Sequence, residues 1–253
     1  MLKKAVFFAF LLTLGAVLSA QQPGEIIRGD FVLQGRVLVR YTGKMETLVI
    51  PPELGITEIG MGAFIRSGVR RVRVPERVTV IGDDAFALSN VEVVQLPSSL
   101  RRIGNRAFYG CKYLASVSLP AAVDYIGNAA FSNTALTSVS LPEGLIYVEE
   151  NAFYGCVNLT RVTLPAGLTG IGNGAFCNTA LTSISLPAWL ASIGDGAFYG
   201  CRGLTGVVLP PAVVSIGARA FAGCTSLRNI RIPLGTEVGA DAFQGAQQPP
   251  TYY

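Results

Sequence analysis

The amino-acid sequence predicts a β-rich solenoid of about nine repeats, each 22–23 residues long with short helical or 3₁₀ turns. The motif I-G-x-x-A-F recurs with small variations, and its last residue falls at Phe64, Phe86, Phe108, Phe131, Phe153, Phe176, Phe198, Phe221 and Phe243. Every one of these except the last leads, ten or eleven residues later, to an apolar residue followed by proline. Half of the residues are hydrophobic and only 14% are charged, so the chain can bury a continuous core.

The first twenty residues have the pattern of a secretory signal. Lys3 and Lys4 precede an apolar run from Ala5 to Leu18, and the small residues at positions 19 and 20 close it. A membrane anchor is the alternative, but the run is short for a membrane span, and no second apolar segment is long enough for one. We therefore expect a signal peptide over 1–20 and a mature chain that is exported to the periplasm or the outer cell surface.

Each repeat contains a strand with the pattern L-x-x-V-x-L, as in residues 136–141, whose apolar positions point inward. Proline ends the strand because it cannot donate to a sheet ladder. A second short extended piece follows, such as 100–103, and Gly104 then turns the chain into a helical or 3₁₀ turn that ends at Phe108. Stacking the repeats would bury their apolar residues and pair the strands in parallel, rung on rung.

Two columns of residues after each phenylalanine indicate a tight turn. The position two residues on is mostly Gly or Asn, which tolerate a left-handed backbone. The next position holds Ser, Thr or Cys in every repeat except the last, so we expect its O–H or S–H group to satisfy a backbone carbonyl. The turn is one residue longer in some repeats, and long and short forms alternate through the middle of the chain.

The pattern L-x-x-V-x-L-P-x-x-L-x-x-I-G-x-x-A-F-x-x-C resembles the BspA-type leucine-rich repeats of bacterial surface proteins, from about Phe31 to Ala246. Residues 31–51 also resemble the hairpin cap that such proteins carry. The resemblance implies a right-handed leucine-rich repeat solenoid over 51–246, with an N-terminal hairpin cap over 21–50. A flexible C-terminal tail is expected over 247–253. Family members are exported, and many are implicated in adhesion, which implies a binding role without naming a ligand.

The outward strand positions form the first candidate surface for a protein partner. We expect the concave face to carry Arg71, Arg73, Gln95, Ser116, Ser118, Ser138, Ser140, Arg161, Thr163, Ser183, Ser185, Asn229 and Arg231. The face has no acidic residue, which suits an extended or mildly acidic partner such as a host matrix or envelope protein. It also lacks the aromatic residues that usually anchor an interface. The alternative interpretation is that these positions are simply solvated.

Three aromatic residues form a second candidate. Tyr125 and Tyr147 occupy one column on adjacent rungs, and Trp189 stands where other repeats have small or polar residues. Exposed aromatic residues often mark interaction sites, although scattered surface aromatics are also common.

The composition argues against most other functions. The chain has no histidine, which excludes His-based acid–base catalysis and His metal ligands. Its net charge of +4 is too small to favour nucleic acid. The cysteines at 111, 156 and 201 lie on every second rung, beyond disulfide reach, so we expect buried free thiols. We therefore expect that the protein is not an enzyme and that it has no catalytic, metal or cofactor site.

The C-terminal end suggests a different role, in assembly of the cell envelope. Nothing comparable to the hairpin cap follows Phe243, so the last full strand, 227–232, would be left as an open edge. The tail, a second copy of the chain or a partner would have to cover it. We expect a homo-oligomer through this end as the alternative to a binding module.

Overall fold

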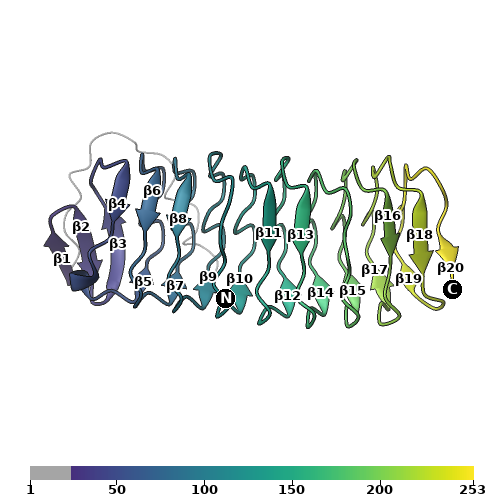
Figure 1. Cartoon of the computed structure of the whole chain (residues 1–253), viewed down its shortest axis with the longest axis horizontal. Helices are drawn as coiled ribbons and strands as arrows, with labels where there is room; N and C mark the ends of the chain where they lie inside the picture. The colour runs from purple at the N-terminus through teal and green to yellow at the C-terminus, as the bar shows by residue number, and fades with distance from the viewer. Residues whose placement is uncertain (1–23) are drawn as a thin grey trace, which may run out of the picture.

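The computed structural model describes residues 24–253 as an elongated stack of rungs (Figure 1). The expected signal peptide over 1–20 lies outside the described residues. The leucine-rich repeat solenoid predicted from the sequence is confirmed, with a rung every 22–23 residues. Within the described range the one assigned helix is the 3₁₀ turn η1 (Pro52–Leu54).

The N-terminal end is an antiparallel meander. Strands β1 (Glu25–Arg28), β2 (Phe31–Gln34) and β3 (Val37–Tyr41) pair in order, and β3 then pairs in parallel with the first rung. The ring of Tyr41 stands 5.5 Å from that of Phe31 and 5.2 Å from that of Phe64, so it joins the meander to the repeat core. The meander therefore covers the first rung and its apolar end.

Two series of parallel strands run along the stack. The first series, in the upper half of Figure 1, consists of β4 (Thr47–Val49), β6 (Arg71–Arg73), β8 (Val93–Gln95), β11 (Ser138–Ser140), β13 (Arg161–Thr163), β16 (Gly206–Val208), β18 (Asn229–Ile232) and β20 (Thr251–Tyr252). The second series, below it, consists of β5 (Glu58–Ile59), β7 (Val80–Ile81), β9 (Arg102–Ile103), β10 (Tyr125–Ile126), β12 (Tyr147–Val148), β14 (Gly170–Ile171), β15 (Ser192–Ile193), β17 (Ser215–Ile216) and β19 (Glu237–Val238).

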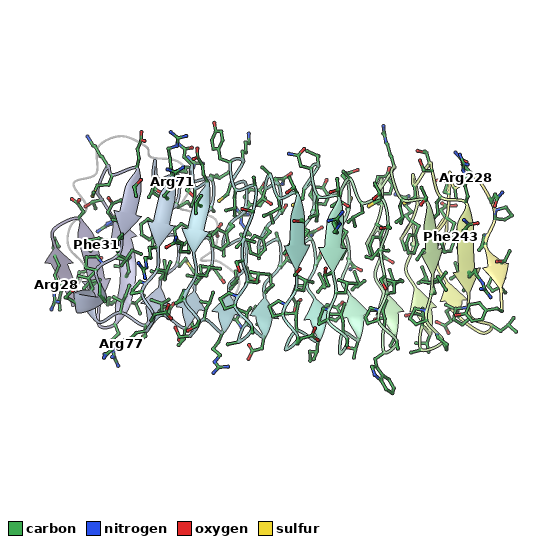
Figure 2. The ribbon with its side chains drawn as sticks, viewed as in Figure 1. Arg28, Phe31, Arg71, Arg77, Arg228 and Phe243 are labelled. Atoms are coloured by element: carbon green, nitrogen blue, oxygen red, sulfur yellow. The ribbon has the colours of Figure 1, made fainter. Side chains whose placement is uncertain are left out.

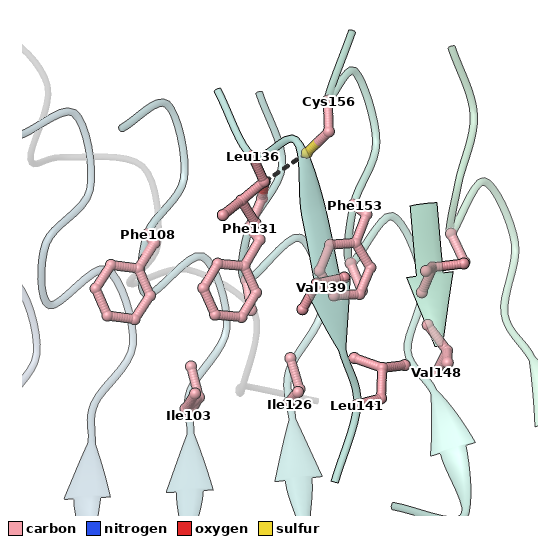
Figure 3. Close-up of a cluster of buried hydrophobic side chains, with 14 of the residues drawn as sticks. Ile103, Phe108, Ile126, Phe131, Leu136, Val139, Leu141, Val148, Phe153 and Cys156 are labelled. Atoms are coloured by element: carbon pink, nitrogen blue, oxygen red, sulfur yellow. Dashed lines mark hydrogen bonds between the residues drawn. The ribbon is translucent and has the colours of Figure 1, made fainter. Parts of the chain in front are cut away.

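The core between the two series and the turns is a column of stacked phenylalanines. From Phe64 to Phe221 every ring of the column is buried, and neighbouring rings stand 4.8–5.6 Å apart and nearly parallel. Apolar residues from both strand series pack around them, as Val139 and Val148 do around Phe153 in Figure 3. The repeat alignment made from the sequence therefore holds through the whole stack.

The turns after the phenylalanines match the expected chemistry except at Ser67, whose buried hydroxyl has no hydrogen-bond partner. The residue two positions on has a positive φ in every repeat, from 54° at Arg66 to 82° at Gly245. In the long turns the thiol of Cys156 donates to the carbonyl of Phe131 in the rung before (Figure 3). In the short turns the hydroxyl of Thr134 donates to the carbonyl of Phe131 in its own rung. Turn length therefore decides whether the donor reaches across rungs or stays within one.

Two expected strands of the first series are extended but unpaired. Residues 116–118 and 183–185 belong to no sheet, so the continuous ladder expected from the repeat is interrupted twice. Their central residues, Val117 and Ile184, are half-buried, whereas Val139 and Val162 on paired strands are buried. Nothing in the neighbouring side chains explains the first interruption.

The C-terminal segment 247–253, expected from the sequence as a tail, ends in a short strand. Thr251 and Tyr252 form β20, which pairs in parallel with β18. The backbone N–H of Tyr253 donates to Ile232, and the Tyr253 hydroxyl donates to the carbonyl of Leu209. The last repeat strand is thus covered by the chain's own end. No strand pattern is visible in this part of the sequence because only two residues pair.

The residue that follows each second-series strand is glycine in eight rungs: Gly60, Gly82, Gly104, Gly127, Gly172, Gly194, Gly217 and Gly239. A Cβ at Gly172 would stand 2.8 Å from the backbone nitrogen of Glu150, and one at Gly127 would stand 2.7 Å from that of Asn105. Glycine is required because the backbones of neighbouring rungs approach this closely. The exception is Glu149.

At Glu149 both ladders stop. The strand before it in the second series, β10, ends one sheet, and β12 begins the next. In the first series, β11 also begins a sheet, because 116–118 is unpaired. The rings of Phe131 and Phe153 across this boundary are 5.6 Å apart, the widest spacing in the phenylalanine column. We call this boundary the seam; turn hydrogen bonds such as Phe131 N–H to Ala152 still cross it.

We expect Glu149→Gly to close the seam, because it removes the Cβ that the close approach of rungs excludes. Backbone amides at 146–149 should exchange with deuterium more slowly than in the wild-type protein, as new inter-rung hydrogen bonds protect them. Glu150→Gln is the control, because it removes a neighbouring negative charge but keeps an oxygen that can accept the hydrogen bond from Asn128. It should leave the exchange unchanged. Unchanged exchange at 146–149 in Glu149→Gly would show that the side chain does not cause the seam.

Candidate functional site

The strand face, meaning the outward residues of the first series and of 116–118 and 183–185, carries the first group of candidate residues. All thirteen are exposed and alternate with inward residues, as expected from the period of two. Strand pairing sets their neighbours: Arg73 lies beside Gln95, and Ser140 lies beside Thr163. Ser116, Ser118, Ser183 and Ser185 lie on the unpaired strands and have no neighbour fixed by a ladder.

The arginines of the strand face are available to a partner. Among the described residues, Arg71, Arg73 and Arg161 form no ion pair. Glu92 is instead bound by Arg70, at 2.5 Å, at the margin of the face. Figure 2 places Arg71 toward the N-terminal end of the stack, and Arg231 lies on β18 near the C-terminal end. The face is therefore basic near both ends and hydroxylated between them.

A hollow of about 520 Å³ lies on the strand face near its C-terminal end. Its lining includes Ser185, Asn229, Ile184, Val208 and Tyr253. Ser185 and Asn229 are among the candidate residues named from the sequence, and Val208 occupies an outward strand position of the repeat. Val208 is exposed, and Ile184, the central residue of the unpaired strand 183–185, is half-buried. Together these two side chains give the hollow an apolar wall.

Tyr253 corrects the expectation that the strand face lacks an aromatic residue. The tail brings its ring onto the face, and the guanidinium of Arg231 lies 5.0 Å from the ring centroid. This is a cation–π contact, which fixes Arg231 beside the hollow. No sequence signal placed Tyr253 here, because its position depends on the path of the tail.

The three aromatic candidates lie away from the strand face, on or beside the second series. Tyr125 is half-buried under Arg102 of the preceding rung, 3.9 Å from its guanidinium. Tyr147 lies over Gly170 of the following rung. The two tyrosines therefore stand on either side of the seam and each packs against the rung on its own side. Burial raises the pKa of Tyr147, and the nearby Glu149 raises it further. Trp189 is 72% exposed. The structure does not bring these residues into one site.

A second hollow of about 420 Å³ lies along the second series and was not expected from the sequence. Tyr147 and Glu237 are among its lining residues, and Ser192 and Ser215 line it between them. The small outward residues of consecutive rungs leave this space. The carboxylate of Asp195, which also lines it, already accepts a hydrogen bond from the backbone of Ala218.

The five cysteines are buried and free, as expected. Burial raises the pKa of Cys111 to about 11 and that of Cys224 to about 12. Such thiols are poor nucleophiles at neutral pH because the thiolate is scarcely populated. The described residues contain no group of three or more Cys, Asp or Glu side chains that could hold a metal ion.

These observations define a repeat solenoid whose chemistry lies on its outer surfaces. The family model described as BspA type leucine rich repeat region, with six copies, matches residues 38–143 and 125–248. The match covers most of the sequence, so the chain belongs to the BspA-type leucine-rich repeat family. No curated protein matches it.

Solved structures of bacterial leucine-rich repeat proteins share the fold. A leucine rich cell surface protein of Faecalibacterium prausnitzii has a TM-score of 0.66 and 24% identity, over 92% of this chain and 78% of that one. A leucine rich repeat protein of T. pallidum has a TM-score of 0.57 and 29% identity, over 81% of this chain and 87% of that one. One from Eubacterium ventriosum has a TM-score of 0.56 and 21% identity, over 83% and 67%.

The family and the fold are typically non-catalytic, and leucine-rich repeat proteins generally mediate protein interactions. No helix in the described part of the chain is long and apolar enough to cross a membrane.

We expect Cys111→Ser to weaken the dependence of stability on alkaline pH. The folded state holds the Cys111 proton up to a pKa of about 11, against an ordinary value of 9.0. Its contribution is fully present below pH 9 and is lost as pH rises toward 11, with a slope of at most about 1.4 kcal/mol per pH unit. A serine hydroxyl does not titrate in this range.

Urea unfolding under reducing conditions, at pH 8 and at pH 10.5, measures the effect. The free energy of unfolding should fall less between these pH values in the variant than in the wild-type protein. Other alkaline groups titrate alike in both proteins and cancel in the comparison. The same fall in both would show that Cys111 ionises as readily in the folded state as in the unfolded one.

Proposed function

We propose that this chain is a non-enzymatic protein-binding or adhesion module of an exported bacterial protein, and that the strand face holds the partner. The observation that carries the proposal is the hollow at Val208 and Tyr253, where an apolar wall, an aromatic ring and the guanidinium of Arg231 lie together on an exposed face. Aromatic and arginine side chains beside a pocket are the residues that most often dominate protein interfaces.

An extended acidic segment fits this face best. One apolar side chain of the segment would fill the hollow and remove Val208 from water. Carboxylates on either side would reach Arg231 and Arg161 by charge-assisted hydrogen bonds. The hydroxyls of Ser183 and Ser185 would bind backbone or polar groups between these anchors, and Ser138 and Ser140 continue the hydroxyl surface on the N-terminal side of Arg161. Arg71 and Arg73 extend the same recognition toward the N-terminal end.

The proposed location is the periplasm or the outer cell surface, and the proposed partner is a host matrix or envelope protein. Two observations support this. The N-terminal sequence has the pattern of a secretory signal. A structural relative, that of Faecalibacterium prausnitzii, is a cell surface protein.

We expect Val208→Glu and Arg161→Glu to abolish capture of the partner, because the first fills the hollow with charge and the second repels acidic groups. The purified mature domain would be used to retain proteins from matrix and envelope extracts, which mass spectrometry then identifies. Val214→Glu and Arg101→Glu are the matched controls, since both residues are exposed but lie outside the strand face. A protein retained by the wild type and controls but lost with both strand-face variants supports the proposal. Equal retention by all five proteins contradicts it.

A role in assembly of the envelope is the second proposal. The tail covers β18, but β20 is then the last strand of its sheet, and Leu234 beside it is 77% exposed. An unpaired strand edge with an exposed apolar residue can pair with another chain.

We expect light scattering on the mature domain to show a mass that increases with concentration if this end self-associates. Leu234→Glu should return it to the monomer, because it adds charge beside the edge. Met61→Glu, at an exposed residue near the N-terminal end of the stack, is the control and should not change the mass. A strict monomer at high concentration rules out assembly through this end.

A further inference from the structure

The turns after the phenylalanines form a second surface that the strand-face proposal does not use. We call it the turn edge and define it as residues 109–113, 132–135, 154–158, 177–180 and 199–203. Long turns, such as 154–158, alternate here with short turns, such as 177–180, which lack one residue. The alternation follows the two ways of binding the phenylalanine carbonyl, by cysteine in the long turns and by threonine in the short ones.

The short turn at 177–180 leaves space between the two long turns beside it. A hollow of about 600 Å³ lies over the short turn at Asn178 and Ala180. Tyr154 and Val157 of one long turn line it on one side, and Arg202 of the next long turn lines it on the other. Val157 is 66% exposed, which is unusual for a branched apolar residue without a partner. The hollow is therefore an apolar site at the surface with a cation at its rim.

The short turn repeats with a fixed spacing. The turn at Asn133 and Thr134 has the same form and lies between the long turns at Tyr109 and Tyr154. Successive phenylalanine rings between the two short turns are 5.6 and 5.5 Å apart, so equivalent positions recur about every 11 Å along the edge. An α-helix rises 1.5 Å per residue, so residues seven apart on one face are about 10.5 Å apart. The spacing of the short turns therefore matches one heptad of a helix.

The charge of the turn edge favours a helix of the opposite charge. Its five turns contain Lys112 and Arg202 and no Asp or Glu. A helix with acidic residues flanking its apolar ones would meet these cations, whereas a basic helix would be repelled.

From this geometry we propose that the turn edge binds an acidic amphipathic helix of a protein partner, which lays one apolar side chain per heptad over each short turn. The apolar side chain packs against Tyr154 and Val157, and a neighbouring carboxylate pairs with Arg202. This is the helix-in-groove mode of recognition, with the anchors seven residues apart. The surface is separate from the strand face, so the proposal does not depend on the strand-face function.

The test uses two synthetic fluorescent peptides of about 22 residues, rich in Ala and Glu to favour helix and acidic overall. The first carries leucines seven positions apart. The second has the same composition with leucines eleven positions apart, which keeps them on one helical face but separates them by about 16.5 Å. Fluorescence anisotropy measures the binding of each to the mature domain.

We expect the peptide with leucines seven positions apart to bind at least about tenfold more tightly than the peptide with leucines eleven positions apart. Val157→Glu and Arg202→Glu should each weaken it by a similar factor. Val208→Glu, in the strand-face hollow, and Val214→Glu, an equal charge elsewhere, should leave it unchanged. Thermal unfolding checks that every variant is folded, which the exposure of these residues favours.

Equal affinity for the two peptides would overturn the proposal, because it would show that the spacing of the short turns is not recognised. Absence of binding by the peptide with leucines seven positions apart would overturn it as well, and so would binding that Val157→Glu leaves intact. Loss of peptide binding in Val208→Glu would instead place the helix on the strand face. Failure of the strand-face proposal alone appears only in the capture experiment and leaves these results unaffected.

Discussion

The phenylalanine of each rung is buried only by the rungs on either side of it. A ring such as Phe153 meets Phe131 at 5.6 Å and Phe176 at 5.5 Å, and no single repeat can enclose it. The spacing of the rings must therefore agree with the spacing of the backbones, which are held at hydrogen-bonding distance in the strands and turns. The glycine column, the left-handed turn position and the Ser, Thr or Cys donors all serve this agreement, because each lets backbones of adjacent rungs approach or satisfies a carbonyl between them.

Because the constraint acts between neighbours, a departure in one rung has a local effect. Glu149 replaces glycine where a Cβ does not fit, and the ladders on both strand series stop at that boundary while the turn hydrogen bonds continue. The N-terminal meander and β20 meet the same constraint at the two ends, since each supplies backbone partners to a rung that has only one neighbour in the repeat. The stack thus tolerates the interruption of its strand ladders at the seam, and the rungs on either side keep their fold.

The features that repeat could be predicted from the sequence, because each is supported by many copies. The buried phenylalanines, the left-handed turns and the buried thiols follow from columns of residues, and the structure confirms them. The features that occur once could not. The path of the tail rests on the pairing of two residues, and the unpaired strand 183–185 has the same pattern as the paired β11. The place of Tyr253 beside Arg231 follows from the tail, so no column of the repeat contains it.

The same distinction bears on function. Residues of the repeat that face inward are fixed by packing and carry no information about a partner. The two proposed binding surfaces therefore rest on outward positions where one rung differs from the next, such as Val208 on the strand face or Val157 on the turn edge. Both are valines exposed where neighbouring rungs place smaller or polar residues, and each lies in a hollow that a change of strand pairing or of turn length creates. A regular solenoid acquires a specific surface at the points where its regularity is interrupted.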